Sequence, residues 1–329
     1  MKTRTFGRTG LQVSELVFGG GWVGGVLIHQ DDDTKRRVLK RALDAGINWI
    51  DTAAMYGKGQ SEQALGWLLP EVDARPYLST KVYLDTGDLR DIPGQIEKSL
   101  HDSLMRMNRG SVDLLILHNP VTAEGRDGAL TPEQILGAGG ALDGLRRVQH
   151  MGLTRFVGMT ALGEAGSLIE VIGSGGFDAA QVYYNVLNPS AARAMPAAWQ
   201  GHRFDGVVAA CKAQGTAVMA IRILAAGVLA TDVRHGREVV ITQGADLPLE
   251  QRRAHAVSAA LGQTCGSRAQ AAVRFALSSP DIACAVVGLA EPSHLEEALA
   301  AQALGPLPTE AMEKLEQLYA ANFGIRVGV

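Results

Sequence analysis

The sequence predicts a (β/α)8 barrel, known as a TIM barrel, built from a single domain that spans residues 1–329. Short β-branched or apolar runs alternate along the chain with longer segments of helical periodicity, which implies parallel strands joined by helical crossovers. Eight such runs over this length favour a closed barrel rather than an open doubly wound sheet. No linker rich in Pro or Ser and no low-complexity stretch interrupts the pattern, which favours one domain.

The elements can be assigned in chain order. The segment FGRTGLQVSE, centred on Gly10, predicts a small hairpin that covers the N-terminal end of the barrel. The first long helix is expected in DDTKRRVLKRALDAG, where Asp33 or Thr34 can cap the start and Gly46 can close the end. The predicted barrel strands are LVFGG near Leu16, INWID ending at Asp51, YLSTK ending at Lys81, VDLLILH ending at His118, TRFVGM around Phe156, AAQVYY around Val182, TAVMAI around Val218 and IACAVVG around Val286.

Composition narrows the class of protein. The net charge is −3 and the basic residues are scattered, so neither nucleic acid nor an anionic membrane is an expected partner, and a small molecule fits better. The start lacks the apolar core of a signal peptide, and the apolar stretch 216–230 is too short to span a bilayer, so we expect a cytoplasmic protein. Cys211, Cys265 and Cys284 are widely spaced, and no Cys or His pattern predicts a metal site. The oligomeric state is left open.

Polar residues end three neighbouring predicted strands. Asp51 ends the second strand, Lys81 the third and His118 the fourth, and Tyr56 lies on the loop after Asp51. Each residue alone has a structural explanation, but β/α barrels carry their active sites at the C-terminal ends of the strands, so their joint placement favours a functional site. A tyrosine hydroxyl, with a pKa of roughly 10, protonates an alkoxide readily only where a cation stabilises its phenolate. Lys81 can be that cation, with Asp51 to orient it and His118 to donate to a substrate oxygen.

Three segments resemble the signature regions of the aldo-keto reductase superfamily: DTAAMYGKGQSEQALG, YLSTKV and SVDLLILHNP. The resemblance extends from FGRTGLQVSELVFGGGW to VVGLAEPSHLEEAL and is to the longer bacterial members, such as aldose and pyridoxal dehydrogenases. It implies an NAD(P)-dependent oxidoreductase with a β/α barrel, no Rossmann fold and a catalytic tetrad of Asp51, Tyr56, Lys81 and His118. It also implies direct hydride transfer between the cofactor and a carbonyl carbon, with Tyr56 exchanging the proton on oxygen.

The first turn contains a GxGxxG pattern, from Gly19 to Gly24. We discount a dinucleotide fingerprint there because the next helix starts only near Asp33 and cannot hold a pyrophosphate at that turn. The resemblance instead places this turn, with Gly21 and Trp22, near the nicotinamide, where Trp22 also faces the substrate. Simple packing is the alternative for Trp22.

The resemblance also implies contacts to the cofactor from later strand ends. Family members bind the carboxamide with a Ser-Asn pair and a Gln, whereas this chain has Thr160 followed by Ala161, and Gln181. Arg222 follows the seventh strand where many relatives place a stacking aromatic residue, so it contacts a cofactor phosphate or a substrate oxygen, or it is a surface arginine. The resemblance also implies that Asp51 contacts the cofactor, as do Leu224 and Gly227 in the loop after Arg222.

The last motif, VVGLAEPSHLEEAL, bears on whether the cofactor is NAD or NADP. Relatives that select NADP often carry Lys and Arg in this loop and helix start, whereas this chain has Gly288, His294 and Glu297. NAD is therefore a serious candidate, and NADP is slightly favoured on family frequency alone.

The expected substrate contacts are Trp22, Tyr56, His118 and Asn119. Further candidates for the pocket, each of which can equally be packed loop core, are Tyr83, Trp199, Phe204 and Phe323. Sugars, aldehydes and cyclic hemiacetals such as pyridoxal all suit the resemblance. Two other functions stay open: a barrel aldolase with Lys81 as a Schiff-base amine, and a non-catalytic cofactor sensor similar to channel-associated subunits.

Overall fold

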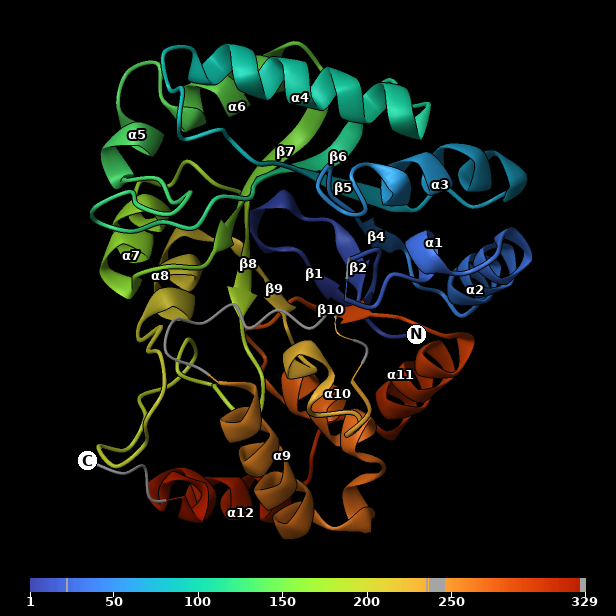
Figure 1. Ribbon diagram of the computed structural model, residues 1–329, viewed down its shortest axis with the longest axis vertical. Coiled ribbons are helices and arrows are strands. Elements are labelled where there is room, and N and C mark those ends of the chain that lie inside the picture. The colour runs from blue at the N-terminus through green and yellow to red at the C-terminus, as the bar shows by residue number, and fades with distance from the viewer. Residues whose placement is uncertain (22, 235, 237–245, 326–329) are drawn as a thin grey trace.

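The computed structural model describes residues 1–21, 23–234, 236 and 246–325. Within this part of the chain, eight parallel strands close into a barrel in the order β10-β3-β4-β5-β6-β7-β8-β9 (Figure 1). Every predicted strand segment is present, and the predicted barrel is confirmed. The strands are β3 (Leu16–Gly19), β4 (Trp49–Asp51), β5 (Tyr77–Val82), β6 (Val112–Leu117), β7 (Thr154–Ala161), β8 (Ala179–Tyr183), β9 (Ala217–Ile221) and β10 (Cys284–Gly288).

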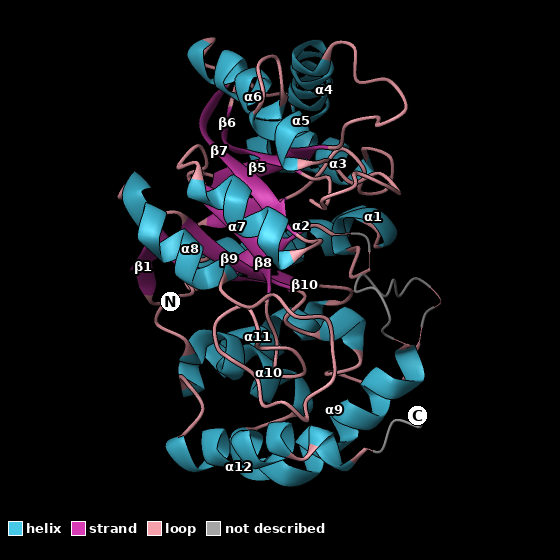
Figure 2. Ribbon diagram, turned by 90° about the vertical axis from the view of Figure 1, so that its left-hand side faces the viewer, coloured by secondary structure: helices cyan, strands magenta, loops and turns pink. Residues whose placement is uncertain are grey.

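Helices surround these strands and bury their apolar stripes against the outer face of the barrel (Figure 2). Helices α9 and α12 pack against each other beyond the ring of helices that connect the strands. The α-helices are α1 (Val26–His29), α2 (Asp32–Asp44), α3 (Gln60–Leu68), α4 (Ile92–Met107), α5 (Pro132–Leu136), α6 (Ala141–His150), α7 (Ala165–Gly173), α8 (Val207–Gln214), α9 (Leu247–Leu261), α10 (Arg268–Ser278), α11 (Pro292–Leu304) and α12 (Thr309–Ala320). The 3-10 helices are η1 (Gly7–Thr9), η2 (Leu69–Glu71), η3 (Ala225–Gly227), η4 (Gln263–Cys265) and η5 (Asn322–Gly324).

Helix α2 shows how the local sequence sets an element and where the prediction was wrong. Its N-cap is Asp31, not Asp33 or Thr34, because the Asp31 carboxylate accepts hydrogen bonds from the backbone N–H and hydroxyl of Thr34. Gly46 follows the helix in the left-handed region, with a φ of 88°, as expected for a residue that closes a helix. None of the helices in the described ranges combines the length and the apolar character that crossing a membrane requires.

The predicted hairpin closes the N-terminal end of the barrel. Strands β1 (Thr3–Thr5) and β2 (Gln12–Ser14) pair antiparallel, and the Phe6 ring packs 4.8 Å, centroid to centroid, from the Trp49 ring. Phe6 and Val13 are fully buried in a cluster with the inward side chains at the start of the barrel strands. The Arg4 guanidinium donates to three backbone carbonyls between residues 277 and 282, so the hairpin is fixed to the turn that precedes β10.

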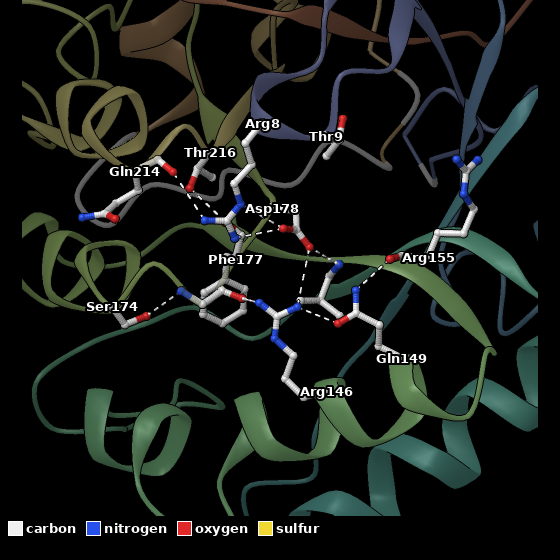
Figure 3. A network of polar contacts seen from close by, with 12 residues as sticks. Arg8, Thr9, Arg146, Gln149, Arg155, Ser174, Phe177, Asp178, Gln214 and Thr216 are labelled. Carbon is white, nitrogen blue, oxygen red and sulfur yellow. Dashed lines mark hydrogen bonds and ion pairs between the residues drawn. The ribbon is translucent and has the colours of Figure 1, made fainter.

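A polar network around Asp178 fixes the other side of this closed end (Figure 3). One Asp178 oxygen accepts from two nitrogens of Arg8, at 2.9 and 3.1 Å, and the other accepts from the backbone N–H of Val157. Arg146 lies farther away, 3.9 Å from that second oxygen. These contacts join the hairpin to β7 and to the residue before β8, which leaves the opposite end of the barrel as the place where polar side chains can meet a ligand.

Candidate active site

The C-terminal ends of neighbouring strands bring the predicted tetrad together. Asp51 is the last residue of β4, Lys81 lies near the end of β5, and His118 directly follows β6. Tyr56 lies on the loop between β4 and α3, where its ring is half-buried. The side chains of Asp51, Tyr56 and Lys81 are in direct hydrogen-bond contact, and His118 lies beside them.

Lys81 is the centre of this arrangement. Its Nζ donates to Asp51 Oδ2 at 2.6 Å, to the Thr52 carbonyl at 2.7 Å and to the Tyr56 hydroxyl at 3.1 Å. The side chain is 1% exposed. Burial disfavours its charge, but the Asp51 carboxylate and the Tyr56 oxygen outweigh this effect and raise the pKa of Lys81. Lys81 is therefore an ammonium at neutral pH, with each of its three N–H groups bonded.

Asp51 is held by a second set of donors. Its Oδ1 accepts from Ser79 Oγ at 2.6 Å and from Gln181 Nε2 at 2.8 Å, and Ser79 Oγ accepts in turn from Trp49 Nε1 at 3.0 Å. Sequence reasoning missed Ser79, although its spacing of two residues from Lys81 in a strand places both on the inner face. Gln181, expected to contact the cofactor, is bonded to Asp51 in this structure.

His118 is neutral over the physiological pH range. Burial, and then the positive charge of Lys81, lower the pKa of His118 to about 3. Its ring centroid lies 6.0 Å from that of Tyr56 and 6.4 Å from that of Tyr83, almost perpendicular to both. The buried Nδ1 has no hydrogen-bond partner among the residues that the structure describes. A neutral imidazole offers one N–H donor and one acceptor to a ligand.

Several residues that the resemblance links to the cofactor lie on the same rim. Thr160 and Gln181 are opposite each other at the ends of β7 and β8. The buried Thr160 hydroxyl has no partner in the described part of the chain. Gly21 borders the Tyr56 ring, because a Cβ added there would lie 3.8 Å from its Cζ. Trp22 lies outside the described residues.

The turn after β9 has an unusual backbone. Arg222, Ala225 and Ala226 adopt positive φ angles of 58°, 46° and 54°, in a region that side chains with a Cβ rarely occupy, and Gly227 follows at 95°. The Asn185 amide donates to the Arg222 carbonyl at 3.0 Å, which helps to hold this conformation. Arg222 is half-buried, and burial lowers its pKa against the opposing effects of Tyr183, Tyr56 and Glu250.

The remaining cofactor candidates lie around the end of β10. Gly288 is its last residue and pairs with Gly19 of β3. His294 Nδ1 accepts from the backbone N–H of Ala290, so this ring also holds the loop in place. His294 and Glu297 are both half-buried on α11. Leu224 and Gly227 are half-buried near η3.

Asn119, which was predicted to contact the substrate, bonds to neighbouring loops in this structure. Its side chain is fully buried; Oδ1 accepts from the Leu84 N–H, and Nδ2 donates to the carbonyls of Leu84 and Gly128. This residue therefore ties two loops together and uses both of its N–H groups to do so. Its place directly after His118 gave no information on the direction of its side chain.

Three of the aromatic residues considered for the pocket are buried inside the loops and pack against other side chains. Trp199, Phe204 and Phe323 are each at most 4% exposed. Phe204 stacks on Tyr183 with ring centroids 5.6 Å apart, and the Arg253 guanidinium covers the ring of Phe323. Tyr83 differs, because it is 38% exposed beside His118. Within the described ranges, no group of three or more His, Cys, Asp or Glu side chains could hold a metal ion.

A closed parallel barrel with titratable groups at the C-terminal ends of its strands defines a β/α-barrel protein of the kind that carries active sites there. A family model described as "Aldo/keto reductase family" matches residues 15–320. The chain belongs to the aldo/keto reductase family.

The chain is also similar to individual curated proteins and to solved structures. The chain is 26% identical over 319 residues to D-threo-aldose 1-dehydrogenase of Pseudomonas sp., which covers 88% of this chain and 89% of the relative. It is 36% identical over 125 residues to a putative voltage-gated potassium channel subunit beta of Schizosaccharomyces pombe, covering 36% of each. The chain matches the first three curated relatives over only 36–49% of their own length. The holo form of an aldo-keto reductase from Bacillus halodurans shares the fold, with a TM-score of 0.74 at 20% identity over 98% of this chain and 97% of that one.

Proposed function

We propose that this chain is an NAD(P)-dependent oxidoreductase that interconverts a carbonyl compound and an alcohol, with Tyr56 as general acid and base. The observation that carries the proposal is the position of Lys81 Nζ, 3.1 Å from the Tyr56 hydroxyl and 2.6 Å from Asp51. An ammonium at that distance from a phenolate stabilises it by about 5 kcal/mol at an effective dielectric constant of about 20. The phenol can therefore give up its proton to an alkoxide and take it back.

The residues of the rim divide the remaining tasks. In reduction, negative charge develops on the substrate oxygen, and Tyr56 supplies the proton that neutralises it. His118, as a neutral imidazole, donates a hydrogen bond to the same oxygen and orients it. Asp51 holds the ammonium of Lys81 in place and is itself fixed by Ser79 and Gln181. In oxidation the same groups act in reverse.

The chain fits a nicotinamide cofactor at this rim. When bound, the cofactor would supply or accept the hydride at the carbonyl carbon. The hydroxyl of Thr160, which has no partner in the described ranges, offers a buried polar contact, and Gly21 leaves space beside Tyr56. The strained turn at Arg222, with Leu224 and Gly227, suits the phosphates, because strain of this kind concentrates at ligand sites. No Lys or Arg lies between Gly288 and Glu297, so NAD and NADP are both proposed.

The geometry argues against the aldolase alternative. A Schiff base requires a neutral, accessible amine, whereas Lys81 is 1% exposed, has a raised pKa and uses every donor. The cofactor-sensor alternative has support in the match to a channel subunit. Tight dinucleotide binding without turnover over a broad panel of carbonyls and alcohols would favour the sensor.

The proposal is tested with Tyr56→Phe. We expect turnover to fall by about 100- to 10,000-fold, because general acid catalysis contributes that much, while the dissociation constant for the cofactor stays within about twofold. The panel includes aldoses, pyridoxal, and aliphatic and aromatic aldehydes, each in both directions with NAD(H) and NADP(H). Tyr77→Phe is the matched control, since Tyr77 begins β5 at the closed end of the barrel. Unchanged turnover in Tyr56→Phe would remove Tyr56 from the mechanism.

A further inference from the structure

Directly behind the tetrad lies a buried carboxylate for which the proposed mechanism has no use. Glu62, in the first turn of α3, is fully buried. Its Oε1 accepts from the Thr80 hydroxyl at 2.5 Å, and its Oε2 accepts from Arg106 Nε at 2.6 Å. A buried charge is costly unless it is paired and hydrogen-bonded, so these two partners hold Glu62 in one position.

Thr80 connects this carboxylate to the active site. It precedes Lys81 in β5, and successive side chains of a strand point to opposite faces. Thr80 therefore bonds to α3 on the outer face, and Lys81 bonds to Asp51 and Tyr56 on the inner face. The same two residues of β5 thus fix both the position of the ammonium and the position of α3.

The loop that carries Tyr56 is held at its start by Lys81 and at its end by Ser61, which precedes Glu62. At its start, the Thr52 carbonyl accepts from Lys81 Nζ at 2.7 Å. At its end, the hydroxyl of Ser61 lies 2.8 Å from that of Thr52, and the Ser61 N–H donates to the Tyr56 carbonyl at 3.3 Å. Ser61 immediately precedes Glu62, so the place of Glu62 against β5 sets where the loop ends.

Arg106 reaches the carboxylate from α4 across the beginning of α3. A Cβ at Gly59 would lie only 2.7 Å from Arg106 Cδ, and Gly59 also has a φ of +91°. Glycine at position 59 therefore allows both the close approach of the Arg106 side chain and the positive φ angle of the turn. Arg106 is in addition fixed by its bond to Ser103 Oγ at 3.0 Å.

We propose that Glu62 is a positioning residue that sets the distance between the Tyr56 hydroxyl and the Lys81 ammonium, through its bond to Thr80 and through Ser61. This inference rests on the proposed function, since it assigns a role in proton transfer at the same site. If the separation lengthens by about 1 Å, Coulomb attraction at an effective dielectric constant of about 20 stabilises the phenolate about tenfold less.

The test removes the hydroxyl of Thr80 without changing its shape. In Thr80→Val, we expect the rising limb of the pH profile for alcohol oxidation to move up by about one pH unit, because the base in that direction is the phenolate. Turnover near neutral pH then falls about tenfold. Thr80→Ser keeps a hydroxyl and should restore the parent profile. Thr154→Val is the matched control, because it removes a buried strand hydroxyl bonded to the Phe156 carbonyl at the closed end.

A second readout does not depend on turnover. Ultraviolet difference titration of each protein against its own Tyr56→Phe derivative reports the ionisation of this phenol, and its midpoint should rise in Thr80→Val and not in Thr154→Val. An unchanged midpoint and an unchanged profile in Thr80→Val would overturn the proposal. If Thr80→Val does not fold, Glu62→Gln gives the same two measurements. If the parent turns over no substrate, the proposed function fails, and the titration still decides the positioning role.

Discussion

Two basic side chains, Lys81 and His118, lie near each other in the site, and their pKa values are shifted in opposite directions. Lys81 has a carboxylate within hydrogen-bond distance, so its pKa is raised although it is buried. His118 has no such partner among the residues that the structure describes, and both burial and the charge of Lys81 lower its pKa to about 3. The Asp51 carboxylate therefore helps to keep the buried Lys81 charged, and that charge helps to keep His118 neutral.

This contrast predicts how stability depends on pH. The unfolded pKa of a histidine is about 6.5, so between that value and about 3 the unfolded chain binds the proton that His118 does not take up in the folded state. The free energy of unfolding should fall as the pH is lowered through this range, by at most about 1.4 kcal/mol per pH unit from this residue. Urea unfolding from about pH 7 to about pH 4 measures the slope.

The variant His118→Asn should flatten this slope, because the titrating ring is gone. His150→Asn is the control, since His150 is exposed at the end of α6. Equal slopes in the parent and His118→Asn would show that His118 does not contribute to the acid sensitivity of the fold.

Local sequence predicted which residues end the strands, and less about what those residues bond to. Asp51, Lys81 and His118 could be placed because each lies at, or next to, the end of a predicted strand. The bond between Gln181 and Asp51 joins residues 130 positions apart, and nothing in either segment specifies it. Asn119 was assigned to the substrate for the same reason, since its partners Leu84 and Gly128 belong to other loops.

At the scale of elements, the hairpin of β1 and β2 is a separate piece of structure that completes the barrel. The strand pattern and Gly10 were sufficient to predict it, because a hairpin depends on neighbouring residues. The start of α2 was harder to predict, because three consecutive aspartates, Asp31 to Asp33, are equally good caps. In the structure, the hydrogen bonds from Thr34 identify Asp31 as the cap.

Phe6→Ala tests the contribution of the hairpin to stability. Phe6 is fully buried against Trp49, so its truncation should lower the free energy of unfolding by about 3–5 kcal/mol. Turnover of the folded fraction should not change, because Phe6 lies at the end of the barrel opposite Tyr56. Leu11→Ala, at a partly buried hairpin position, should cost less. A loss below about 1 kcal/mol for Phe6→Ala would mean that the hairpin only covers the barrel without stabilising it.

At the scale of the whole molecule, long-range packing decides what the loops offer to a ligand. The loop between β8 and α8 is fastened to the C-terminal part of the chain: the Tyr319 hydroxyl donates to the Val186 carbonyl at 2.9 Å, and Arg253 donates to the Gln200 carbonyl at 2.5 Å. These contacts bury Trp199, which the sequence left open as a pocket residue. The alternation of strands and helices predicted the barrel, whereas contacts of this kind between distant segments could not be predicted.

A nicotinamide cofactor should stabilise the whole fold. Binding to the native state alone adds about 2.7 kcal/mol at a free concentration of about one hundred times the dissociation constant. We expect the thermal midpoint to rise by about 5 °C with the preferred cofactor and less with the other, when NADPH and NADH are compared at equal concentration. Thermal unfolding followed by fluorescence measures the shift. The absence of any shift with both cofactors would contradict the proposed cofactor use.

The hairpin closes the N-terminal end of the barrel: Phe6 packs on Trp49, Arg4 bonds to the turn before β10, and Arg8 bonds to Asp178. Because the interior of a β/α barrel is filled with side chains, a ligand approaches Tyr56 from the C-terminal rim. Under the proposed function, the cofactor and the carbonyl compound therefore share that rim. We expect the reactant that binds deeper to bind first and to leave last.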